Sequence, residues 1–151
     1  MDRVLKAICR WQPATAAATL VCAGVLSGVA AAGSPYTVMV KVAPSTVPVP
    51  GTSTVTATGL SSNRSRLKVF LNARSPCAAT AAADAAIAGD VLIASPALGV
   101  VGSYVHTKVV STVSGATGPR GPGNHQACAY LIAWPPSALP RGHASAAYAV
   151  G

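Results

Sequence analysis

Two cysteines, Cys77 and Cys128, follow an N-terminus that has the layout of an export signal. Three basic residues within the first ten precede a nearly uncharged stretch, residues 14–33. A basic segment, an apolar segment and then small residues are typical of a secretory signal peptide. Export places the rest of the chain in an oxidising compartment, where two thiols usually pair. We therefore expect a small exported domain that contains one disulfide.

The predicted signal peptide ends at the alanine triplet Ala30–Ala32, which fits an A-x-A cleavage site. Cleavage there divides the chain into a signal peptide, residues 1–32, and a mature domain, residues 33–151. The alternative is an uncleaved anchor, because residues 14–32 are just long enough to span a bilayer. This segment has few strongly apolar residues, which favours cleavage. We expect a secreted or extracytoplasmic protein of the cell envelope, with membrane contact only through an uncleaved signal segment.

The mature domain has a thin predicted core and a positive charge. Hydrophobic residues make up 51% of the chain, but many are Ala, and Phe70 and Trp134 are the only Phe and Trp after residue 32. A disulfide matters more when the core is thin. Of the formal net charge of +8, residues 1–32 contribute +2, which leaves +6 for the mature domain. This charge either serves solubility or attracts anionic polymers, and export argues against nucleic acid as a partner.

Alternating apolar and polar residues predict a series of short β-strands with turn signals between them. The predicted strands cover residues 36–42, 52–60, 67–73, 90–94, 102–113, 126–134 and 143–150. The strand at 126–134 is apolar on both faces, which is typical of a central strand covered on both sides. In the strand at 102–113, the valines at odd positions compete with Tyr104 and Val110 for the buried face. About seven such strands predict an all-β antiparallel sandwich.

An alanine-rich segment between the third and fourth predicted strands favours a short helix. Ser75 suits an N-cap, Pro76 suits the first helical position, and Gly89 suits the end. We expect a helix at 77–88, and the alternative is a crossing loop. A glycine-rich segment at 114–124 predicts a flexible hairpin loop.

The chain resembles an immunoglobulin-like domain found in exported actinobacterial proteins of mostly unknown function. The resemblance rests on VFLNARSPCAATAAADAA, GSYVHTKVV, GNHQACAYLIAW and SAAYAVG, and it covers residues 36–151. Its most specific parts are the segments Cys77–Thr80 and Cys128–Leu131. The resemblance implies an Ig-like β-sandwich with a Cys77–Cys128 bond, and it implies no catalytic residues.

The pattern departs from that of true immunoglobulin domains. Tyr130 comes two residues after the second cysteine rather than two before it, and no Trp lies in the strand that precedes Cys77. A tyrosine corner and a Trp-covered disulfide are therefore not expected.

Residues for acid–base or metal chemistry are few. A Ser-His-Asp triad would draw on His106, His125, His143, Asp84 and Asp90, but the sequence contains no G-x-S-x-G elbow. The two acids are the only carboxylate pair for glycoside hydrolysis. We expect Asp84 on the exposed face of the alanine-rich segment and Asp90 at a strand start. The histidines lack ligand spacing and are expected to be solvated, so no metal, no cofactor and no enzyme activity is predicted.

A basic stripe gives the sharpest binding hypothesis. It consists of Arg64, Arg66, Lys68, Phe70 and Arg74, which share one parity and alternate with aliphatic residues. On a strand, residues of one parity lie on one face, so the stripe is predicted to face solvent. Four cations beside one aromatic ring suit an anionic or carbohydrate wall polymer. The alternative is a solvated face, or an edge strand whose charges prevent aggregation.

We therefore predict an exported or envelope-associated, non-enzymatic Ig-like domain with a structural or binding role. Its partner would be an anionic cell-wall polymer or another envelope protein. The alternatives are a small secreted hydrolase and a dedicated polymer binder.

Overall fold

The computed structural model describes residues 36–61, 64–73, 76–99, 101–133 and 140–151. Its strands are β1 (Thr37–Ala43), β2 (Thr46–Val47), β3 (Gly51–Ser61), β4 (Ser65–Asn72), β5 (Val91–Ala94), β6 (Ala97–Leu98), β7 (Gly102–Thr112), β8 (Gly123–Ala133) and β9 (Gly142–Val150). Two short helices, α1 (Ala81–Ala86) and the 3-10 turn η1 (Gly118–Arg120), interrupt them. None of these helices is long and apolar enough to cross a membrane.

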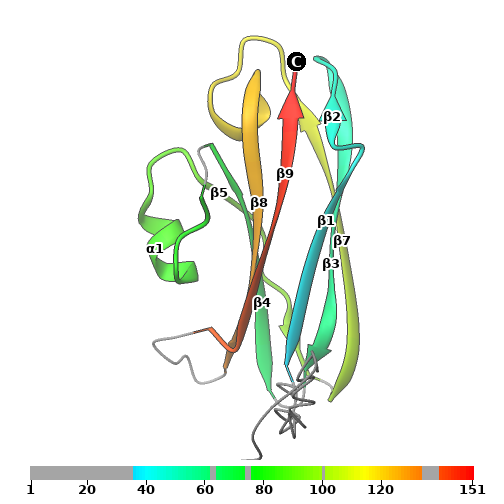
Figure 1. Cartoon of the computed structure of the whole chain (residues 1–151), viewed down its shortest axis with the longest axis vertical. Coiled ribbons are helices and arrows are strands. Elements are labelled where there is room, and N and C mark those ends of the chain that lie inside the picture. Colours follow the sequence, from blue (N-terminus) through cyan, green and yellow to red (C-terminus); the bar gives the residue numbers. More distant parts are fainter. Residues whose placement is uncertain (1–35, 62–63, 74–75, 100, 134–139) are drawn as a thin grey trace, which may run out of the picture. The chain divides into compact units, whose positions relative to one another are not determined.

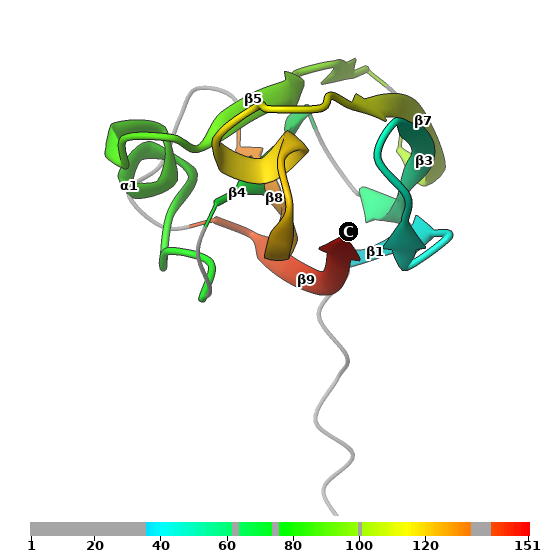
Figure 2. The same cartoon turned by 90° about the horizontal axis from the view of Figure 1, so that it is seen from above.

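Two sheets face each other across the core (Figures 1 and 2). One has three strands in the order β1-β3-β7, and the other has the order β2-β9-β8-β4-β5, with β6 also paired to β4. All pairs are antiparallel except that of β2 with β9. The chain is therefore an Ig-like all-β sandwich, as predicted.

Each of the seven predicted strands is present, with shifts of a few residues at the ends. The two additional strands, β2 and β6, have two residues each. A strand of two residues is too short to show any periodicity, so the sequence gives no signal for it. The predicted hairpin loop at 114–124 contains η1, and β8 begins before the loop was expected to end.

The core between the sheets is built from alternate positions of the facing strands. It consists of Val42, Val47, Val55, Ala57, Leu67, Val69, Leu71, Val110, Ala127, Ala129, Tyr148 and Val150. In β7, Val110 is buried beside its partner Ser53, so the even positions face inward. The odd-numbered valines of β7 therefore face solvent, which decides the face that the sequence left open.

The helix is shorter than predicted. It begins after Thr80, whose Oγ1 accepts a hydrogen bond from the Ala83 N–H at 3.1 Å and caps the first turn. The predicted start at Cys77 is wrong because Thr80 is extended, and Cys77 is held against β8 by the disulfide and by its hydrogen bond to Gln126. The predicted cap, Ser75, lies outside the described residues.

Candidate functional site

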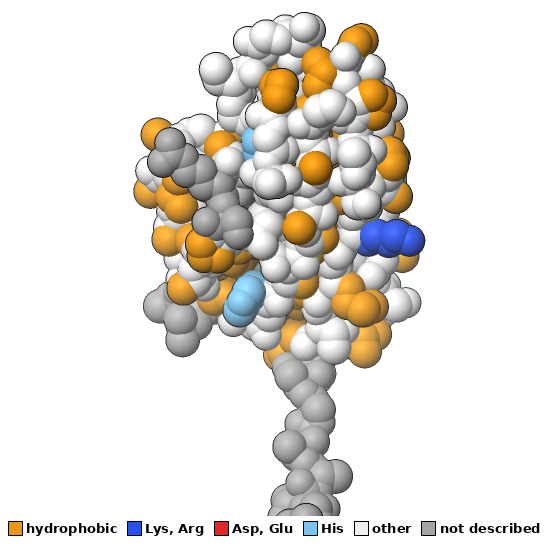
Figure 3. Space-filling view, turned by 45° about the horizontal axis from the view of Figure 1, so that its top comes forward, with side chains coloured by type: hydrophobic (Ala, Val, Ile, Leu, Met, Phe, Trp, Pro, Cys, Tyr) orange, Lys and Arg blue, Asp and Glu red, His pale blue; other side chains and the backbone are white. Residues whose placement is uncertain are grey.

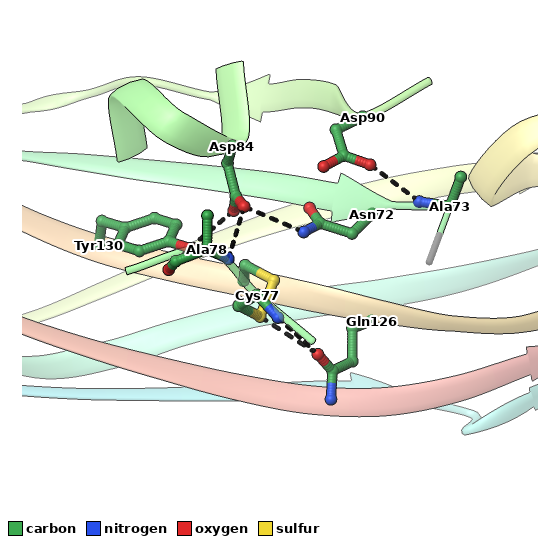
Figure 4. The surroundings of a disulfide bond; sticks show 9 residues. Asn72, Ala73, Cys77, Ala78, Asp84, Asp90, Gln126 and Tyr130 are labelled. Atoms are coloured by element: carbon green, nitrogen blue, oxygen red, sulfur yellow. Dashed lines mark hydrogen bonds between the residues drawn. A yellow bond between two sulfur atoms is a disulfide. The ribbon is translucent and has the colours of Figure 1, made fainter. Parts of the chain in front are cut away.

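A disulfide joins Cys77 to Cys128 and fastens the segment before α1 to β8, as predicted. The two Cα atoms are 5.8 Å apart. Beside the bond, the Gln126 side chain accepts a hydrogen bond from the Cys77 N–H at 3.1 Å. Figure 4 shows the bond lying next to a set of buried polar side chains.

Asp84 lies at the centre of this polar set. One carboxylate oxygen, Oδ1, accepts hydrogen bonds from the Ala78 N–H at 2.7 Å and from Asn72 Nδ2 at 3.2 Å. The other oxygen, Oδ2, accepts a hydrogen bond from the Tyr130 hydroxyl at 2.7 Å (Figure 4). The Asp84 side chain therefore links α1 to β4, to β8 and to the segment that carries Cys77.

The prediction that Asp84 is exposed is wrong, because the residue has no accessible surface. Ala81 and Asp84 are the buried residues of α1, and they lie three positions apart on one helical face. That face lies against the six-stranded sheet. An isolated Ala-rich sequence does not indicate which face a sheet will cover.

A second, smaller core lies on the far side of the six-stranded sheet from the main core. Phe70 and Tyr130 meet there edge to face, with ring centroids 6.1 Å apart, beside Ala81 and Cys128. Burial, and then the hydrogen bond to Asp84, raises the pKa of Tyr130 far above its ordinary value. The hydroxyl therefore remains a donor in this network at neutral pH.

Asp90 precedes β5, at the strand start where it was predicted. Its Oδ1 accepts a hydrogen bond from the Ala73 N–H at 3.1 Å. Its Oδ2 is buried and has no hydrogen-bond partner among the described residues. Burial, with a smaller contribution from the nearby Asp84, raises the pKa of Asp90 above its ordinary value.

The three histidines lie in different settings, and the His143 ring stacks on that of Tyr130, with ring centroids 6.2 Å apart. His125 is buried, with Nε2 at 2.8 Å from the Gly121 carbonyl oxygen and Nδ1 at 3.3 Å from that of Ala73. The prediction of a solvated side chain is therefore wrong for His125, which fixes the loop before β8. His106 is half-buried and His143 is exposed. Within the described ranges, no three His, Cys, Asp or Glu residues are grouped to hold a metal ion.

The basic stripe is divided by the structure. Arg66 and Lys68 are half-buried and alternate with buried aliphatic residues, so the predicted parity is correct. Phe70 is only 2% exposed, because the segment that contains Cys77 and α1 covers this end of β4. The predicted exposed ring is therefore wrong. Arg74 lies outside the described residues.

The alternative of a charged edge strand is also wrong, since β4 lies inside the six-stranded sheet between β8 and β5. The charges of β4 therefore do not protect a sheet edge from pairing with another chain. The cations of β4 are held on the surface of a central strand.

Arginines gather at the start of β4. Arg64 and Arg66 line a pocket of about 350 Å³ together with Ser65 and residues 97–99. Arg141 donates a hydrogen bond from Nη1 to Ser65 Oγ at 3.1 Å, and its guanidinium lies 4.5 Å from the centre of the Tyr36 ring. We call Arg64 and Arg66, which line this one pocket, the arginine cluster. Sequence reasoning missed Arg141, because nothing near it in the chain signals its approach to β4.

No family model and no curated protein matches this chain. Similar solved structures include a CARDB domain from Pyrococcus furiosus in complex with di-metal ions, with 13% identity and a TM-score of 0.47 over 77% of this chain and 87% of that chain. An alkylpurine DNA glycosylase from Pseudomonas fluorescens has 15% identity and a TM-score of 0.46, and the match covers 80% of this chain and 31% of the enzyme. A beta-glucosidase from Listeria innocua has 14% identity and a TM-score of 0.40, and the match covers 77% of this chain and 16% of the enzyme. These likenesses concern the fold alone.

Proposed function

We propose that this chain is an exported or envelope-associated Ig-like domain with a non-enzymatic, structural or binding role. The observation that carries the proposal is the network beneath α1. Both oxygens of Asp84 and the hydroxyl of Tyr130 bond to groups of the chain itself. The groups best suited to acid–base chemistry therefore hold the fold together.

The disulfide supports the export part of the proposal. Disulfides form and persist in oxidising compartments and are rare in the cytosol. The test is to express the full chain in its host and to recover it from medium and envelope. N-terminal sequencing should give Gly33 as the first residue, and non-reducing peptide mapping should give the Cys77–Cys128 pair. A protein that begins at Met1 and carries two free thiols would contradict the proposal.

The non-enzymatic part is tested against the alternative of a small secreted hydrolase. Purified protein is assayed on chromogenic esters, glycosides and peptides. We expect no turnover above buffer. Turnover that disappears in a His106→Ala variant would establish the alternative, because His106 lies on β7, outside the buried network.

A second candidate function is binding of an anionic wall polymer at the arginine cluster and Lys68. Two observations favour it: Arg64 and Arg66 share one pocket, and the described part of the chain has only two acids, one of them fully buried. The face shown in Figure 3 is mostly uncharged, with Lys or Arg visible at one place and no acidic side chain visible. A surface that has more exposed cations than exposed acids attracts polyanions.

Co-sedimentation with purified cell walls tests this candidate. Binding should fall steeply from low to physiological salt, because screening weakens exposed charge pairs. Arg64→Glu combined with Lys68→Glu should abolish it. The matched control is Lys41→Glu combined with Lys108→Glu, which changes the net charge equally on the other sheet. Equal losses in both variants would show that only the overall charge matters, and an absence of binding would leave β4 as a solvated face.

A further inference from the structure

β7 is a long, regular edge strand. It pairs with β3 through an unbroken register of eleven positions, from Gly51 opposite Thr112 to Ser61 opposite Gly102. No described strand pairs with its other edge, and Figure 1 shows β7 on the outer side of β3. Natural edge strands are usually short, bulged, charged or broken by proline. β7 contains no proline, and Lys108 is its only Lys, Arg, Asp or Glu.

The exposed side of β7 carries valines that alternate with Ser103, Thr107 and Ser111. Val105 and Val109 face solvent and are 72% and 60% exposed, and Val101 and Val113 lie just beyond the two ends of the strand, at 69% and 49%. These four valines lie at one parity along a single line. Unpaired backbone groups beside exposed β-branched side chains form a template for another strand.

We propose that β7 pairs antiparallel with β7 of a second copy of this chain, around a two-fold axis at Thr107. The two three-stranded sheets then join into one continuous sheet. In this register, Val105 lies opposite the partner's Val109, and Val101 lies opposite the partner's Val113. Each of the four valines therefore lies opposite a valine of the partner, and Gly102 lies opposite the partner's Thr112 at the ends of the ladder.

Symmetry restricts the alternatives. Directly opposite residues of an antiparallel pair lie on the same face, so they have the same parity. The two-fold axis of a symmetric pair must therefore pass midway between one residue and its own copy. An axis at Lys108 places two lysines directly opposite each other. An axis at Val105 or Val109 leaves one of the four valines unmatched and shortens the ladder. The axis at Thr107 uses the whole strand and places Lys108 opposite the partner's His106.

The gain from this pairing is mainly the backbone ladder. An antiparallel pair of this length adds about ten hydrogen bonds between the copies. The ladder ends at Thr112, because the N–H of Val113 already donates to the Arg120 carbonyl at 3.2 Å. An edge-to-edge contact buries less surface than a standard stable interface, so the dimer should dissociate on dilution.

Sedimentation velocity on a dilution series of the full chain tests the proposal. The wild type should shift from monomer to dimer as its concentration rises. Val105→Lys with Val109→Lys places lysine opposite lysine twice and should remove the dimer. Val105→Lys with Val109→Glu places lysine opposite glutamate twice and should restore it. Met39→Lys is the matched control, since Met39 is 62% exposed on β1, at the opposite edge of the same sheet from β7.

Melting temperatures by circular dichroism show whether each variant is folded, which is expected because both valines are exposed. A wild type that stays monomeric overturns the proposal. So does a dimer that survives in the double-lysine variant, since it must form elsewhere. A lysine–glutamate variant that is folded but monomeric overturns the register.

Discussion

At Asp84, a carboxyl group with no exposed surface accepts hydrogen bonds from a backbone N–H, an amide and a phenol. A buried acid is costly unless each of its oxygens has donors. Here the donors come from three separate parts of the chain. The same burial that would penalise an isolated carboxyl group therefore makes Asp84 specify how α1 lies on the sheet.

Tyr130→Phe tests this network by removing only a hydroxyl. We expect a loss of about 2 kcal/mol, because the hydroxyl lies against the Asp84 carboxyl group and the Ala78 carbonyl. Tyr148→Phe is the matched control. Its hydroxyl donates to the neutral Pro119 carbonyl at 2.8 Å, so about 1 kcal/mol is expected. Urea unfolding measures both, and equal losses would contradict a special role for the acid.

Asp90 should make stability depend on pH. Its pKa in the folded chain is raised above the ordinary value of 3.8. The protonated form therefore stabilises the fold below that value, and this stabilisation is lost as the pH rises through the folded-state pKa. Asp90→Asn keeps an oxygen for the Ala73 N–H and removes the charge. The free energy of unfolding of this variant should therefore exceed that of the wild type most at neutral pH. The difference should disappear below about pH 4. Melting temperatures of the two proteins between neutral and acid pH measure this difference. A difference that grows toward low pH would contradict a raised pKa of Asp90.

Among the elements, β1 and β7 leave no room for a side chain at Gly59 of β3. A Cβ atom there would overlap the backbone carbonyl of Thr37 and lie 2.8 Å from the Tyr104 hydroxyl. That hydroxyl donates to the same Thr37 carbonyl at 3.1 Å, and burial raises the pKa of Tyr104 to about 12. The close approach of the three strands therefore requires glycine at this position.

Gly59→Ala should cost about 1–3 kcal/mol, as expected for overpacking against a backbone that cannot retreat. Gly99→Ala is the matched control, because nothing lies within 4 Å of its added carbon. Chemical denaturation of the two variants gives the difference. If Gly59→Ala is as stable as Gly99→Ala, the strands do not pack as closely as described.

The seven longer strands were predictable because each carries a local signal, either alternation of apolar and polar residues or an apolar run. In β8, Cys128 and Tyr130 alternate with core alanines, and both faces are covered as the pattern indicated. The start of α1 and the burial of Phe70 were not predictable. Both depend on Cys77 being held against β8 by the disulfide and by Gln126, and no local pattern encodes that contact.

Across the whole molecule, the long-range contacts with a sequence signal are those made by the disulfide. Cys77 and Cys128 were predicted to pair because they are the two cysteines of the expected mature domain, and thiols usually pair in an oxidising compartment. Arg141 and Ser65 meet across a separation of 76 residues, and no pattern near either residue signals the contact, so the approach of Arg141 to β4 could not be inferred. The six-stranded sheet separates the core between the sheets from the core beneath α1, and the disulfide belongs to the core beneath α1.

Removing the disulfide should therefore weaken the molecule unevenly. The bond spans 51 residues, and the constraint on the unfolded chain corresponds to about 4 kcal/mol. A Cys77→Ala/Cys128→Ala variant should melt at a lower temperature than the oxidised wild type. Hydrogen exchange should accelerate most at the Ala78 and Ala83 amides beneath and within α1, while the central positions of β8 retain most of their protection. Loss of protection that is uniform over both cores would mean that the disulfide and the sandwich fold as one unit, and an unchanged melting temperature would mean that the Asp84 network alone suffices to hold α1.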